Sequence, residues 1–72
     1  MNVFLFAGVA NDDSKEWCRA FDTLAEAEAC RERADEYCER RGTSLVYDSI
    51  REVSREDADR AVARHAASLA TA

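Results

Sequence analysis

Strand-like and helical patterns of hydrophobic residues divide the chain into five segments. Residues 3–9 are almost entirely apolar, with the sequence VFLFAGV. A short continuous apolar run is typical of a strand buried on both faces, so we expect this segment to be the central strand of a sheet. Residues 16–21 follow a turn-forming stretch at 11–14 and return to a strand-like pattern. The two segments therefore predict a β-hairpin.

A capping-box sequence marks the start of the first helix. Glu26 lies three residues after Thr23, so the threonine hydroxyl can accept from the Glu26 amide while the carboxylate reaches back to the Thr23 amide. We expect the helix to end near Arg41, because Gly42 enters the left-handed conformation without strain. Between these limits, apolar residues recur every three or four positions and predict an inner face of mostly small side chains: Ala27, Cys30, Ala34, Tyr37 and Cys38.

The remaining segments predict a third strand and a second helix. Residues 43–53 read as an edge strand, with a bend or bulge near Asp48 and Ser49. Ser54 is a good N-cap for the helix that follows, and we expect residues 71–72 to fray. The apolar stripe of this helix is rich in alanine: Ala58, Ala61, Val62, His65, Ala66 and Leu69. It packs either on the rest of the domain or against a second copy of the chain.

The order of these segments predicts a single α+β domain over residues 1–72. A helix returning from the second strand leaves the third strand parallel to the second, and therefore antiparallel to the first when the two are neighbours. We predict a three-stranded antiparallel sheet of order 2-1-3 with ββαβα topology. One helix packs on one face of the sheet, and the other face is either covered by the C-terminal helix or left open for a partner.

Charge and hydropathy exclude several classes of partner. The formal net charge is −5 and the chain contains one lysine, so we expect no direct nucleic-acid binding, which depends largely on Lys and Arg contacts to phosphates. No apolar run approaches the roughly 20 residues of a membrane span. The N-terminal residues lack a basic segment and a cleavage signal. We therefore expect a cytoplasmic protein that does not insert into a membrane.

The sequence contains no recognisable catalytic or metal-binding pattern. His65 is the only histidine, and its spacing from the cysteines matches no zinc motif. The thiols are either small buried hydrophobes or, on a third hypothesis, a redox group: Cys18, Cys30 and Cys38. Two glycines cannot make a phosphate-cradling loop. We expect no metal, no cofactor and no enzymatic activity.

The most informative functional pattern is a row of acidic residues on the first helix. Helical spacing places four of them within about 60° of one another, roughly opposite the small inner face, with Glu36 at the border: Glu28, Glu32, Asp35, Glu36 and Glu39. The row is either a solvated face or a negative surface that binds a basic partner. On the second interpretation, Asp12 and Asp13 enlarge it.

Two aromatic residues are candidate anchors for a protein contact. Trp17 is the only tryptophan, and Tyr47 lies in the third predicted strand. Trp and Tyr are over-represented among the residues that dominate binding energy in protein interfaces. The alternative is that both are half-buried residues of the sheet.

In size, acidity and element order, the whole chain resembles small phage-encoded inhibitor proteins, including anti-CRISPR proteins. This resemblance implies a non-enzymatic module that blocks a host nucleic-acid-binding complex by presenting carboxylates where phosphates would lie. Our leading hypothesis is therefore a protein partner with a basic surface. The alternative is a small structural or regulatory subunit that forms a homodimer through the C-terminal helix or a sheet edge.

Overall fold

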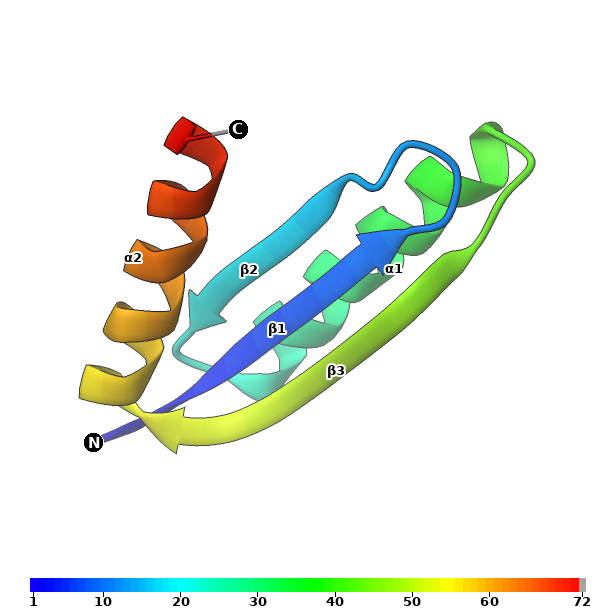
Figure 1. The fold of residues 1–72 in the computed structure, drawn as a ribbon. Helices are drawn as coiled ribbons and strands as arrows, with labels where there is room; N and C mark the ends of the chain where they lie inside the picture. The colour runs from blue at the N-terminus through cyan, green and yellow to red at the C-terminus, as the bar shows by residue number, and fades with distance from the viewer. Residues whose placement is uncertain (72) are drawn as a thin grey trace.

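A computed structural model describes residues 1–71 and has the predicted α+β fold (Figure 1). Its elements are β1 (Asn2–Ala10), β2 (Glu16–Phe21), α1 (Leu24–Arg40), β3 (Leu45–Ser54) and α2 (Arg55–Thr71). The sheet order is β2-β1-β3, and both pairings are antiparallel. The fold class, the topology and the strand order are thus confirmed. Of the two residues expected to fray, Thr71 is the last residue of α2, and residue 72 lies outside the described residues.

β1 is apolar from Val3 to Ala10 because both of its faces are covered there. Phe6 is fully buried and packs with Cys30 and Ala34 of α1. Val3 and Leu5 point to the opposite face, since side chains alternate along a strand, and both are also buried. α2 lies on that second face. Figure 1 shows α1 running along the strands behind the sheet and α2 standing at one side.

α1 begins with part of the predicted capping box. The Thr23 hydroxyl accepts from the Glu26 amide at 3.2 Å, as expected. The reciprocal bond differs from the prediction, because the Glu26 carboxylate accepts from the Thr23 hydroxyl at 2.9 Å instead of from the Thr23 amide. The hydroxyl thus serves as both donor and acceptor.

The C-terminus of α1 is a complete Schellman motif. Gly42 has a φ of 71°, as predicted for a glycine cap. Its amide donates to the Glu39 carbonyl at 3.0 Å, and the Thr43 amide donates to the Cys38 carbonyl at 2.9 Å. The small inner face is also confirmed, since its four smallest residues are at most 3% exposed: Ala27, Cys30, Ala34 and Cys38.

The bulge predicted near Asp48 and Ser49 was wrong, because both residues pair regularly with β1. The irregularity lies at the start of β3, where Val9 pairs with Tyr47 and Ala10 pairs with Leu45. Val46 is therefore the extra residue, and its side chain is 66% exposed. This insertion turns Leu45 to the face that α1 covers, where it packs against the core.

α2 covers only part of the second face of the sheet. Ser54 caps the helix as predicted, accepting from the Asp57 amide at 3.1 Å. Ala58 is fully buried, His65 is half-buried, and Leu69 is 59% exposed. The exposure of the apolar stripe thus increases toward the C-terminal end of α2, away from the sheet. Within residues 1–71, neither helix combines the length and the apolar character needed to cross a membrane.

Candidate functional site

The two flanks of α1 face different edges of the sheet. Tyr37 lies on one flank and makes an edge-to-face contact with Trp17 of β2, with ring centroids 5.6 Å apart and an interplanar angle of 77°. This flank therefore faces β2, and the opposite flank faces β3, since β1 lies between the two edge strands. Helical spacing places four exposed carboxylates on the β3 side, which we call the acidic flank: Glu28, Glu32, Asp35 and Glu39.

The carboxylates of the acidic flank have no hydrogen bond or ion pair within the part of the chain that the structure describes. The neighbouring Glu36 differs, because it forms an ion pair with Arg40 at 4.0 Å. Arg31 is partly buried beside the flank but forms no ion pair with a described residue. The acidic flank is thus a surface of unpaired carboxylates, with Arg31 as the neighbouring cation.

β3 adds two carboxylates on the same side of the molecule. Asp48 pairs with Gly8 and Glu52 pairs with Phe4, so both face the side of the sheet that α1 covers. Ile50 lies between them and packs against the α1 core. Sequence reasoning missed these two residues, although their alternation with Ile50 in an edge strand was a usable signal.

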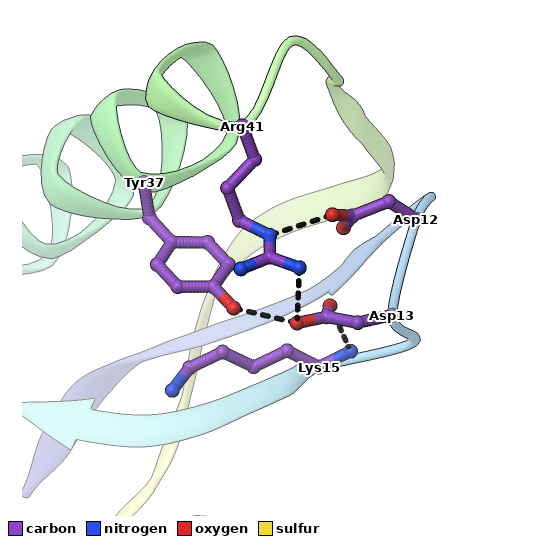
Figure 2. Close-up of polar contacts among 5 residues, drawn as sticks. All are labelled: Asp12, Asp13, Lys15, Tyr37 and Arg41. Carbon is purple, nitrogen blue, oxygen red and sulfur yellow. Dashed lines mark hydrogen bonds and ion pairs between the residues drawn. The ribbon is translucent and has the colours of Figure 1, made fainter.

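The two hairpin carboxylates are held in contacts to the end of α1 (Figure 2). Asp12 accepts from the Arg41 Nε at 2.6 Å. Asp13 accepts from the Tyr37 hydroxyl at 2.6 Å and from the Lys15 amide at 3.0 Å. A second Arg41 nitrogen lies 3.8 Å from Asp13. These residues therefore fix the hairpin loop to the helix instead of adding free charge to the acidic flank.

The contacts in this loop change the acidity of two groups. The Tyr37 hydroxyl, followed by the Lys15 amide, lowers the pKa of the Asp13 carboxyl because both donate to its charged form. The same hydrogen bond raises the pKa of Tyr37, since a carboxylate acceptor stabilises the protonated hydroxyl. Both effects favour the bonded arrangement near neutral pH.

The structure does not bring the two candidate anchors together. Trp17 is half-buried on the α1 side of the sheet, where it contacts Tyr37. Tyr47 is 54% exposed, and its pairing with Val9 places it on the opposite face. Its hydroxyl lies 3.1 Å from the Ser49 hydroxyl. Neither aromatic ring adjoins the acidic flank.

Three reactive side chains line one small hollow of about 280 Å³ on the second face of the sheet. His65 Nδ1 lies 3.5 Å from a carboxylate oxygen of Glu16, and Cys18 lines the same hollow. Burial raises the pKa of the Cys18 thiol, so the nucleophilic thiolate is disfavoured. No group of three or more metal-ligating side chains gathers among the described residues.

The other two cysteines, Cys30 and Cys38, are buried in the core, and burial raises the pKa of the Cys38 thiol. They pack as small hydrophobic residues, which is the first of the two interpretations of the thiols.

Comparisons of the chain with models of known protein families, with curated proteins and with solved structures gave no match.

Proposed function

We propose that this protein is a non-enzymatic binding module whose acidic flank contacts a basic surface on a protein partner. The supporting observation is that Glu28, Glu32, Asp35 and Glu39 are exposed and unpaired within residues 1–71. Like charges four residues apart cost a helix a few tenths of a kcal/mol per pair. A basic partner would convert this repulsion into attraction across the interface.

The spacing of these carboxylates suggests the class of basic surface. Glu28 and Glu39 are eleven positions apart, which is about 16 Å along a helix axis. The flank therefore presents about one charge per 5 Å, compared with about 3.4 Å per phosphate along one DNA strand. Asp48 and Glu52 add charge beside it. We propose that the module occupies a nucleic-acid-binding surface of its partner and blocks it, as the resemblance to phage-encoded inhibitors implies.

Charge reversal with a matched control tests this proposal. Asp35→Lys reverses a charge on the acidic flank, and Asp59→Lys makes the same change at an exposed, unpaired aspartate of α2. The wild type and the two variants are each used as bait to capture proteins from a lysate, and the retained proteins are quantified by mass spectrometry. The expected partner is retained by the wild type and by Asp59→Lys but is lost with Asp35→Lys.

Two further observations complete the test. The retained protein should elute with added salt, because exposed charges are screened over about 8 Å at physiological ionic strength. Adding the module to the retained protein should also displace nucleic acid that is bound to it. Retention that is equal for all three baits would contradict the role of the acidic flank.

Self-association is a second candidate, favoured by exposed apolar side chains. Tyr47 is 54% exposed and Leu69 is 59% exposed, and α2 covers only part of the second face of the sheet. Light scattering over a range of concentrations tests this function. A mass that stays at the 8.1 kDa of one chain would contradict it.

A further inference from the structure

A groove runs between the outer edge of β2 and α2, away from the acidic flank. Its volume is about 440 Å³, which lies within the range of pockets that bind ligands. Cys18, Arg19 and Ala20 line its β2 side, and Asp59, Val62, Ala63 and Ala66 line its α2 side. The wall formed by α2 is therefore apolar over much of its length and is built from small side chains that leave room for another chain.

The backbone of β2 has unused hydrogen-bonding capacity along this groove. β2 pairs only with β1, so its outer amides and carbonyls face away from the sheet. No backbone hydrogen bond from the described residues reaches this outer edge. The sequence contains no proline, so no residue of Glu16–Phe21 lacks an amide for a further pairing. An edge strand of this kind is a template for an added strand.

The α1 side of the same edge carries cations without carboxylate partners. Arg19 pairs with Phe6 and therefore faces α1. Arg33 lies one turn before Tyr37, on the flank that faces β2. The Lys15 ammonium lies 5.1 Å from the Tyr37 ring centroid. Within residues 1–71, none of these three cations forms an ion pair, although the chain as a whole has a net charge of −5.

We propose that this groove binds an extended peptide as a fourth strand on β2. Successive side chains of a strand point to opposite faces, so one set would lie against Val62 and Ala63 of α2, and the other set would face Arg19, Arg33 and Lys15. The fitting peptide alternates apolar and acidic residues. A second copy of the chain fits less well, because two β2 edges would bring the same cations together. Among the described lining residues, Asp59 is the one carboxylate, and it lies on the α2 wall.

This binding mode is strand addition, in which main-chain hydrogen bonds supply affinity and alternate side chains supply specificity. It uses the β2 side of the molecule and does not depend on the function proposed for the acidic flank. Each surface can therefore be tested without the other.

Synthetic peptides of defined chemistry test the proposal. The probe is a capped heptapeptide that alternates glutamate and valine, titrated into the ¹⁵N-labelled protein and followed by NMR. We expect the largest amide shifts in Glu16–Phe21 and in the α2 wall. A heptapeptide with lysine in place of glutamate should bind more weakly. Two further probes are N-methylated, one at the glutamates and the other at the valines. Their affinities should differ, because only one of these two sets of amides faces the neighbouring strand.

Matched variants locate the site. Ala63→Trp fills the groove, whereas Ala67→Trp adds the same bulk at an exposed alanine of α2 outside the groove lining. Ala63→Trp should weaken the glutamate peptide by about tenfold or more, because filling a packed space is costly, and Ala67→Trp should not. Arg19→Glu should reverse the preference between the two peptides, while Arg64→Glu, at another exposed and unpaired arginine, should preserve it.

Three outcomes would overturn the proposal. Equal binding of both N-methylated peptides would exclude strand pairing. Equal binding to Ala63→Trp and Ala67→Trp, with both folded by circular dichroism, would place the peptide elsewhere. If the NMR shifts of the β2 amides change with protein concentration in the absence of any peptide, the groove would instead be assigned to a second copy of the chain.

Discussion

At the residue scale, the Asp13 carboxylate links the hairpin loop to the end of α1. It accepts hydrogen bonds from the Tyr37 hydroxyl and the Lys15 amide, and Arg41 lies beside it. These donors stabilise the charged carboxylate, so its pKa is lowered. The loop is consequently held by a group whose charge depends on pH.

The first prediction follows from this pKa. Because the folded-state pKa of Asp13 lies below its ordinary value of 3.8, its stabilising effect is fully present above about pH 5 and is lost as the pH falls through the folded-state value. Asp13→Asn should therefore unfold at lower denaturant concentration than the wild type from pH 5 to 8, and the difference should shrink below about pH 4. Asp59→Asn, which removes an exposed unpaired carboxylate, is the control and should show no such narrowing.

Gly8 allows the core aromatic ring to lie close to β1. A Cβ at this position would be 3.0 Å from the tip of the Phe6 ring and 3.3 Å from the Tyr47 carbonyl oxygen. Phe6 is fully buried, so its ring cannot move aside freely. We expect Gly8→Ala to lower the free energy of unfolding by about 1–3 kcal/mol through overpacking, as measured by urea denaturation.

The double variant Gly8→Ala/Phe6→Leu separates steric overlap from a general effect on β1. If the ring is the obstacle, the double variant should lose less stability than the sum of the two single variants. Strictly additive losses would contradict this explanation.

At the scale of elements, both helices are bounded by local signals. The C-terminus of α1 depends on Gly42, whose φ of 71° is unfavourable for residues with a Cβ. No atom lies within 4 Å of a Cβ built there, so the cost of a substitution is conformational. We predict that Gly42→Ala lowers the free energy of unfolding by about 1 kcal/mol. Gly42→Asn should lose less, because asparagine tolerates this conformation; an equal loss in urea denaturation would contradict the argument.

Such local signals explain which features of the fold could be predicted from the sequence. Thr23, Gly42 and Ser54 act within one turn of their own position, so the helix limits and the order of elements followed from the chain itself. The bulge at Val46 depends on turning Leu45 toward α1, a requirement that exists only once the helix and the sheet are packed together. Its position could not be found from the alternation within β3 alone.

The same distinction between local signals and distant contacts explains why only part of the candidate site was predicted. Helical spacing was sufficient to group Glu28, Glu32, Asp35 and Glu39 on one flank. It could not show that Asp12 and Asp13 are held by the end of α1, nor that Asp48 and Glu52 lie beside the flank, because these contacts join distant parts of the chain. Unpaired and paired carboxylates look alike in a sequence.

At the scale of the whole molecule, the charges without an ion pair or hydrogen bond among residues 1–71 differ mainly in sign between the two sides of α1. The acidic flank faces the β3 edge, whereas Arg33, Lys15 and Arg19 lie toward the β2 edge. The distribution of the Cα atoms extends 38 × 31 × 13 Å, so the molecule is flat. The net charge of −5 therefore conceals an uneven distribution of unpaired cations and carboxylates between the two edges of the sheet. A partner that approaches the β3 edge meets mostly unpaired carboxylates, and one that approaches the β2 edge meets unpaired cations.

The last prediction is that the two surfaces bind independently. A helix is about 10 Å across, which exceeds the screening length of about 8 Å at physiological ionic strength, so charges on one flank should have little effect on the other. Asp35→Lys should leave the affinity for the glutamate–valine peptide unchanged, and Ala63→Trp should leave capture by the acidic flank unchanged. Both are measured at physiological salt. A reciprocal loss in the two variants would mean instead that both partners compete for one surface or that α1 shifts when either is bound.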